Sequence, residues 1–102
     1  MEVFNKGQII DLLKQNSSEL EKFGVNRIGV FGSFVTGKQS AHSDIDLIVE
    51  FNKGQKNFRN FIGTANFTED LLGRKVDLLT PQSLSPYIAS RIEKDIEYVQ
   101  IS

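Results

Sequence analysis

The sequence predicts a protein of the α/β (α+β) class that forms a single domain over residues 1–102. Two observations indicate this class. Segments with apolar residues at helical spacing alternate along the chain with short β-branched runs typical of strands. Apolar residues make up 39% of the chain, which is enough to build one hydrophobic core. No repeat, charge block or low-complexity tract marks a boundary between domains.

The first part of the chain predicts a helix, a strand and a loop. A helix from about Lys6 to Phe23 is indicated by apolar residues at mostly helical spacing, and Gly24 is a typical stop signal. These apolar residues are Ile9, Leu12, Leu13, Leu20 and Phe23. The short β-branched segment Arg27–Phe31 predicts a strand. Gly32–Ser43 is rich in Gly, Ser and Thr and therefore predicts a loop.

The middle of the chain predicts a second strand and a second helix. In the segment from Ile45 to Phe51, apolar residues alternate with Asp46, Ile48 and Glu50, which favours a strand. Residues 57–72 carry apolar residues around a helix, and we expect its phenylalanines, Phe58, Phe61 and Phe67, in the core.

The last part of the chain predicts a third strand and a final helix. Lys75–Leu79 is the strand, and Ser83 or Ser85 is the expected cap of the helix. The predicted helix has an apolar side made of Tyr87, Ile88, Ile92, Ile96, Tyr98 and Val99. The expected order is therefore helix, strand, loop, strand, helix, strand and helix.

The composition excludes several classes of protein. The chain has no cysteine, which excludes disulfide frameworks, thiol nucleophiles and thiolate metal sites and fits the reducing cytoplasm. With 12 Lys+Arg against 13 Asp+Glu, no strong direct binding to nucleic acid is expected. Apolar runs are only a few residues long and the first residues lack a leader pattern, so we expect neither membrane insertion nor export.

Gly32–Lys38 matches the G-x-x-x-x-G-K part of a P-loop, which is the first candidate function for the predicted loop. A complete P-loop continues with Ser or Thr and then a helix whose N-terminus faces the phosphates. Here Gln39 follows Lys38, and only five residues separate Lys38 from Asp44. Because no full helix fits in that space, a P-loop is disfavoured.

Three aspartates form the second candidate site. Asp44 and Asp46 open the second predicted strand, and the alternation of side chains places both on one face. Asp77 is an acid in an otherwise apolar strand and joins them if the two strands are neighbours. Carboxylates held this close repel one another, and a divalent cation such as Mg²⁺ relieves the repulsion. The glycine at position 32 lets the backbone approach phosphate oxygens, and Ser33 adds an N–H and a hydroxyl.

These residues resemble a known family. Gly32–Ser33, ten residues and then Asp44–Val49 look like the signature of the nucleotidyltransferases related to DNA polymerase beta. Residues 76–81 are similar to the third motif of that family, and the resemblance runs from about Arg27 to Thr80. The chain length points to the minimal nucleotidyltransferase (MNT) branch. The resemblance implies a mixed β-sheet flanked by helices, in the palm-like nucleotidyltransferase fold.

The resemblance also implies roles for individual residues. Gly32 and Ser33 would hold the triphosphate of an NTP, expected to be ATP, and two Mg²⁺ ions would bind the carboxylates of Asp44, Asp46 and Asp77. Asp77 would also help to deprotonate the acceptor. Further candidate nucleotide-binding residues lie along the same loop: Thr36, Gly37, Lys38 and Ser43.

The implied reaction is the in-line attack of an acceptor hydroxyl on the α-phosphorus, which releases pyrophosphate and leaves NMP on the acceptor. Many minimal members resemble MntA-type antitoxins, which silence a HEPN-domain ribonuclease by binding it and by transferring AMP to one of its tyrosines. We therefore expect an NTP and a HEPN toxin as partners, with homo- or hetero-oligomers as open possibilities.

One departure from the family keeps an alternative open. The family often carries Arg where this sequence has Thr36, and threonine cannot supply a bidentate phosphate clamp. The alternative is a catalytically weak or inactive module of the same fold that binds a partner through apolar helix residues around Phe58, Phe61 and Phe67. Modification of a small molecule is a further alternative, but such enzymes usually carry an extra acceptor domain.

Overall fold

The computed structural model describes residues 3–102, in which four strands form one mixed β-sheet. The spatial order is β3-β2-β1-β4. The central strand β1 is antiparallel to β2 and to β4, whereas β2 and β3 are parallel. The strands are β1 (Val25–Phe31), β2 (Ile45–Phe51), β3 (Val76–Leu79) and β4 (Glu97–Gln100). This mixed sheet confirms the predicted fold class.

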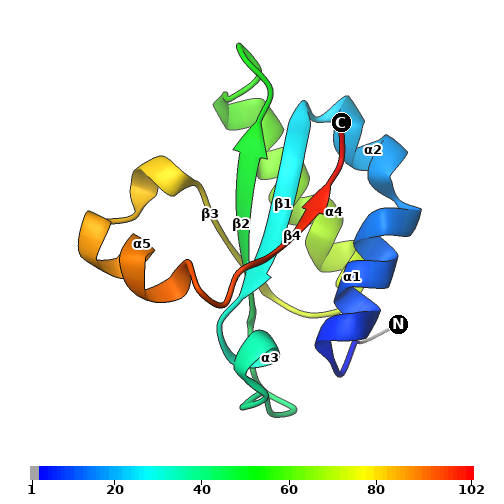
Figure 1. Cartoon of the computed structure of the whole chain (residues 1–102). Coiled ribbons are helices and arrows are strands. Elements are labelled where there is room, and N and C mark those ends of the chain that lie inside the picture. The colour runs from blue at the N-terminus through cyan, green and yellow to red at the C-terminus, as the bar shows by residue number, and fades with distance from the viewer. Residues whose placement is uncertain (1–2) are drawn as a thin grey trace.

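Helices lie on both sides of the sheet (Figure 1). The α-helices are α1 (Lys6–Gln15), α2 (Ser17–Lys22), α3 (Ser33–Thr36), α4 (Phe58–Leu72) and α5 (Pro86–Ile92), and a 3₁₀ turn, η1 (Pro81–Ser83), follows β3. In Figure 1, α5 and the segment that leads from it to β4 cross the side of the sheet opposite to α4. No helix within residues 3–102 is long and apolar enough to cross a membrane.

The hydrophobic core lies between the sheet and the three helices α1, α2 and α4. Alternate strand residues point to this side, because successive side chains of a strand face opposite directions. The core residues of the strands are Val25, Ile28, Val30, Ile45, Leu47, Val49, Val76, Leu78 and Val99, and they pack against Ile9, Leu13, Leu20 and Leu72 of the helices. We call this side of the sheet the core face.

The helix predicted over residues 6–23 is interrupted at Asn16. The backbone of this residue leaves the helical region, with φ −113° and ψ 23°, and its side-chain amide donates to the carbonyl of Leu12 at 2.8 Å. Asparagine side chains compete in this way with the helical hydrogen bonds. The prediction of one continuous helix is therefore wrong, and α1 and α2 are separate.

The second predicted helix is confirmed as α4, with small differences in what it buries. Asn57 caps it by accepting a hydrogen bond from the Asn60 amide at 2.8 Å. Phe61 and Phe67 are partly buried against the core as expected. Phe58 is 80% exposed, so its predicted place in the core is wrong; it stands in the first turn of the helix, on the side that faces solvent.

The prediction of the last helix is confirmed for its first part and is wrong for its end. Ser85 caps α5 by accepting from the Ile88 amide, but α5 ends at Ile92, and the residues from Glu97 onward form β4. Val99 pairs with Ile28 of β1 and is only 3% exposed, so burial in the sheet overrides a spacing that also fits a helix. Tyr87 is 71% exposed and Tyr98 lies on β4, so neither belongs to a buried helix side.

The side of the sheet opposite to the core face, which we call the open face, carries a small second apolar cluster around Gly29. A Cβ atom at position 29 would lie 2.6 Å from Ile96 Cγ2, 3.0 Å from Tyr98 Cδ1 and 3.1 Å from Ile48 Cγ2. The missing side chain therefore lets residues of β2, β4 and the α5–β4 connection close over β1.

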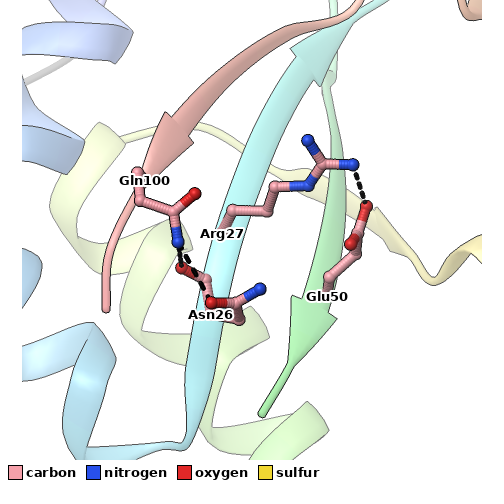
Figure 2. A network of polar contacts seen from close by, with 4 residues as sticks. All are labelled: Asn26, Arg27, Glu50 and Gln100. Atoms are coloured by element: carbon pink, nitrogen blue, oxygen red, sulfur yellow. Dashed lines mark hydrogen bonds and ion pairs between the residues drawn. The ribbon is translucent and has the colours of Figure 1, made fainter.

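A polar network extends this cluster across three strands (Figure 2). Arg27 of β1 forms an ion pair with Glu50 of β2 at 2.8 Å, and the hydrogen bond to Glu50 raises the pKa of Arg27. The guanidinium carbon of Arg27 also lies 3.7 Å from the centroid of the Tyr98 ring. Gln100 of β4 donates to the carbonyl of Asn26 at 3.0 Å. At this end of the open face the charges of Arg27 and Glu50 are therefore already paired with each other.

Candidate active site

The sheet brings two of the three predicted aspartates together. Asp46 of β2 pairs with Asp77 of β3 in the parallel register, which confirms that the two strands are neighbours. Paired residues of adjacent strands project to the same face. Asp44 stands two residues before Asp46, just outside β2. The acids thus gather at the start of β2 and β3, on the open face of the sheet.

The negative charges of Asp44 and Asp77 act on the carboxylate of Asp46. Asp46 is half-buried, whereas Asp44 and Asp77 are exposed. Burial raises the pKa of Asp46 above its ordinary value, and the negative charges of Asp77 and Asp44 raise that pKa further. The structure therefore holds a carboxylate whose ionised form is stabilised when a cation is nearby.

The carboxylate oxygens of the three aspartates suit a cation that is also bound by water and by a substrate. Among the described residues 3–102, no group of three or more His, Cys, Asp or Glu side chains is arranged to hold a metal ion by itself. Mg²⁺ typically takes one or two carboxylates and completes its shell with water and substrate phosphates. The hard oxygen donors of Asp46 and its neighbours fit that mode of binding and do not form an all-protein cage.

Gly32 lies directly against Asp46. Its φ is +78°, in the region that favours glycine, and an added Cβ would overlap with Oδ2 of Asp46. The residue that follows β1 must therefore be a glycine both for its backbone conformation and for its contact with the carboxylate. Through this contact the loop after β1 and the aspartates belong to one site.

The loop predicted over residues 32–43 contains one helical turn, α3, that the sequence analysis missed. Gly32 is the N-cap of this turn, and Gly37, with φ +79°, ends it in the left-handed conformation. Phe34 of α3 is 2% exposed and anchors the turn in the core. Gly, Ser and Thr are weak helix formers, so this turn depends on the buried phenylalanine and the two glycines.

Four of the predicted nucleotide-binding residues line one cavity of about 480 Å³: Gly32, Ser33, Thr36 and Lys38. The opposite wall comes from α5 and the residues after it: Ile88, Arg91, Ile92 and Asp95. We call this space the α3–α5 cavity. The residues of the opposite wall were not predicted to belong to a site, because their spacing also fits one amphipathic helix with a buried side.

The other two predicted nucleotide-binding residues do not line the α3–α5 cavity. Gly37 ends α3. Ser43 is engaged in its own loop, because its hydroxyl accepts a hydrogen bond from the Ser40 amide at 2.8 Å. His42, in the same loop, is exposed. A second cavity, of about 270 Å³, lies beside the far end of β2 and contains none of the predicted site residues.

Arg74 holds the loop that leads to Asp44, a role that no pattern in the sequence predicts. It is 8% exposed, its Nε donates to the carbonyl of Val3 at 2.7 Å, and its Nη1 contacts three loop carbonyls. These are the carbonyls of Ser40 (3.3 Å), Ala41 (3.0 Å) and Ser43 (3.2 Å). The guanidinium carbon also lies 5.3 Å from the centroid of the Phe34 ring. One buried arginine therefore connects α3, the loop and the chain entry to β2.

Comparisons with known proteins agree with this architecture. The protein adenylyltransferase MntA of Thermococcus cleftensis is 39% identical over 93 residues, which cover 90% of this chain and 93% of the relative. A toxin–antitoxin crystal structure with AMP-PNP matches with a TM-score of 0.64 and 25% identity, over 93% of this chain and 72% of the other.

A third match shows the fold. It is the complex of a tri-AMPylated HEPN toxin of Shewanella oneidensis with its MNT antitoxin, with a TM-score of 0.53 and 19% identity over 83% of this chain and 69% of the other. The family model described as a nucleotidyltransferase domain matches residues 8–99. That match includes the loop after β1, the aspartates and both walls of the α3–α5 cavity. The chain therefore belongs to the nucleotidyltransferase domain family and is a nucleotidyltransferase.

Proposed function

We propose that this protein transfers AMP from ATP to a hydroxyl group of a partner protein, and that the partner is a HEPN ribonuclease toxin modified on tyrosine. The observation that carries this proposal is the register of Asp46 with Asp77 beside the Gly32 loop, in a chain of the nucleotidyltransferase family. The relative named MntA, the AMP-PNP in one similar structure and the AMPylated HEPN toxin in another support the choice of nucleotide and acceptor. In this role the protein is an antitoxin.

The residues of the loop after β1 bind the nucleotide in this proposal. The first amides of a helical turn have no partner inside the helix. In α3 the amides of Val35 and Thr36 donate to the Gly32 carbonyl, so those of Ser33 and Phe34 are the ones available to phosphate oxygens. Ser33 adds its hydroxyl, and Lys38 adds a positive charge from the same wall of the cavity. The glycine at position 32 keeps the phosphates close to Asp46 because it leaves no side chain between them.

The carboxylates carry out the chemical step. The acceptor oxygen forms a bond with the α-phosphorus, the bond from that phosphorus to the bridging oxygen of the β-phosphate breaks, and pyrophosphate leaves. Asp77, an exposed acid in register with Asp46, takes the proton of the acceptor hydroxyl. Asp44 and Asp46 would hold Mg²⁺, and Asp77 would be a further ligand once water and substrate phosphates complete the shell. When bound, Mg²⁺ neutralises charge on the phosphates and on the entering and leaving oxygens.

A second candidate function is a partner-binding module with weak or no catalysis. Phe58 is 80% exposed and Ile62 is 38% exposed one turn later on α4, so this helix presents an apolar strip that a partner protein could cover. Thr36 also lacks the charge that an arginine would contribute to phosphate binding. Both functions include a partner, and they differ in their need for the aspartates.

The test is the transfer of label from ATP to a purified HEPN toxin in the presence of Mg²⁺. ATP labelled at the α-phosphate should label the toxin, ATP labelled at the γ-phosphate should not, and the label should map to tyrosine. The Asp44→Asn/Asp46→Asn variant should bind the toxin but transfer at least about 10³-fold less AMP, because catalytic carboxylates are not replaced by amides.

Circular dichroism would show that this variant is folded. Absence of α-label with the folded wild-type protein and its toxin would contradict the enzymatic proposal. Retained neutralisation of the toxin by the double variant would then favour the partner-binding module.

A further inference from the structure

We infer that Arg91 of α5 binds the polyphosphate of the nucleotide from the wall of the α3–α5 cavity opposite to Lys38. The inference rests on the proposed function, since it assigns a residue to the nucleotide site used there. It adds a contribution from α5, an element outside the loop and the aspartate motifs.

The cavity has two walls from parts of the chain that lie far apart in sequence. Ser33, Thr36 and Lys38 form one wall, and Ile88, Arg91 and Ile92 are on the other. Figure 1 shows α3 and α5 as separate elements at the same end of the sheet. The α3–α5 cavity has a volume of about 480 Å³, which is within the usual range for sites that hold molecules of nucleotide size.

The loop wall of the cavity offers little positive charge to a nucleotide. A nucleoside triphosphate is highly anionic, and the nearby Asp44, Asp46 and Asp77 add further negative charge. The loop wall contributes Lys38 alone, because Ser33 and Thr36 are neutral. Arg91 is the one guanidinium on the lining of the cavity, and its fork of N–H donors matches phosphate oxygens in pairs.

Arg91 is free to bind an anion. The ion pairs formed among residues 3–102 involve Lys6, Lys22 and Arg27 and do not include Arg91. The side chain of Arg91 is exposed, and its guanidinium carbon lies 5.8 Å from the centroid of the Tyr87 ring. No carboxylate partner therefore has to be displaced when a phosphate binds.

The rest of the α5 wall fits the uncharged part of a nucleotide. Ile88 is 48% exposed and, together with Ile92, gives the cavity an apolar strip. Asp95 is the one carboxylate on the lining and repels phosphate, but it can accept hydrogen bonds from ribose hydroxyls. The polyphosphate is therefore directed toward Lys38 and Arg91 and away from Asp95.

The experiment measures the dissociation constants of ATP, ADP and AMP for the full chain by isothermal titration calorimetry with Mg²⁺. Arg91→Gln should weaken ATP binding at least about tenfold, ADP binding less, and AMP binding within about twofold. Arg91→Lys should fall between Arg91→Gln and wild type, because it keeps the charge without the fork. Arg59→Gln, which changes an exposed arginine of α4 outside the cavity, is the matched control and should leave all three constants unchanged.

A second variant tests whether the loss in Arg91→Gln comes from the missing charge or from a change in the structure of the cavity. Thr36→Arg introduces a guanidinium on the loop wall, so the Thr36→Arg/Arg91→Gln double variant should recover most of the affinity for ATP. An unchanged ATP constant in Arg91→Gln, or an equal loss for ATP and AMP, overturns the role of Arg91. If either of these results is found while the wild type binds ATP and transfers AMP, the proposed function stands without a role for Arg91. A wild-type protein that binds no ATP contradicts both.

Discussion

The two faces of the sheet are built in opposite ways, although they share the same strands. On the core face, Leu47 of β2 is fully buried between the sheet and the helices. On the open face, the next residue, Ile48, is also buried, but it lines a pocket of about 240 Å³ under α5. No residue of α5 is buried, whereas α1 buries two and α4 buries three. Packing is thus concentrated on one face, and charge and open space on the other.

This difference separates the stability of the fold from the requirements of the site. Asp46 and Asp77 face away from the core. The repulsion between them destabilises the fold, and packing on the core face offsets this cost. A site that needs three close carboxylates destabilises any region that contains it.

The largest expected effect is the loss of stability in Leu47→Ala. The substitution leaves a cavity in the core, and we expect it to lower the free energy of unfolding by about 3–5 kcal/mol. Ile48→Ala should cost about 1–3 kcal/mol, because Ile48 borders an existing pocket into which its neighbours can relax. Urea unfolding followed by circular dichroism measures both. Equal losses at the two positions would show that the faces are packed alike.

The second effect is the loss of the connection made by Arg74. Arg74→Ala removes the donor shared by four backbone carbonyls, and we expect the free energy of unfolding to fall by about 2–3 kcal/mol. AMP transfer should fall at least about tenfold, mainly in kcat, because the loop no longer fixes Asp44. Lys75→Ala, at the exposed neighbouring position, is the control and should change the free energy by less than about 0.5 kcal/mol. A wild-type kcat in Arg74→Ala would contradict the positioning role.

The third effect separates backbone strain from contact with the site. Gly32→Ala and Gly54→Ala both place a side chain at a positive φ, +78° and +80°, and this backbone strain should cost each variant about 1–3 kcal/mol of stability. A Cβ at position 54 meets open space, whereas a Cβ at position 32 overlaps with Asp46 Oδ2. Gly32→Ala should therefore also reduce AMP transfer by about 10²-fold or more, while Gly54→Ala leaves it unchanged. Equal transfer rates in the two variants would show that the contact between Gly32 and Asp46 has no role.

The features that the sequence predicts are those that depend on neighbours along the chain. The alternation in β2 predicts which face Asp46 occupies, and the pattern of residues 57–72 predicts α4. The strand β4 is missed because Ile92, Ile96 and Val99 also fit a helix, and only pairing with β1 selects the strand.

The same distinction applies to the candidate site. The proximity of Asp46 and Asp77 follows from two strand patterns and the assumption that the strands are adjacent. Arg74 contacts carbonyls that are 31 to 71 residues away in sequence, so nothing in its local pattern reveals its role. Arg91 lines the cavity only because α5 folds back over the open face. Long-range contacts of this kind leave no periodic signal in one sequence.

The smallest expected effect is a gain in stability in Asp46→Asn, measured in EDTA and without nucleotide. Burial and then the charges of Asp77 and Asp44 raise the pKa of Asp46 above 3.8, so the folded state binds this proton more tightly than the unfolded state. The contribution of Asp46 to stability is therefore fully present below the unfolded pKa and is lost as the pH rises through the folded pKa. Asparagine does not ionise, so the variant should unfold a few degrees higher than wild type at about pH 7, with the difference shrinking toward about pH 3.

This gain carries information because it has the opposite sign to the effect on catalysis. Asp46→Asn should be more stable and inactive, which is the expected result where a carboxylate is kept on the open face for its ligand and not for the fold. Thermal unfolding monitored across the pH range gives the comparison, and Mg²⁺ with ATP should reverse it by stabilising only the wild type. A variant that is less stable than wild type at about pH 7, or a difference that does not vary with pH, would show that Asp46 supports the fold. The open face would then contribute to stability as the core face does.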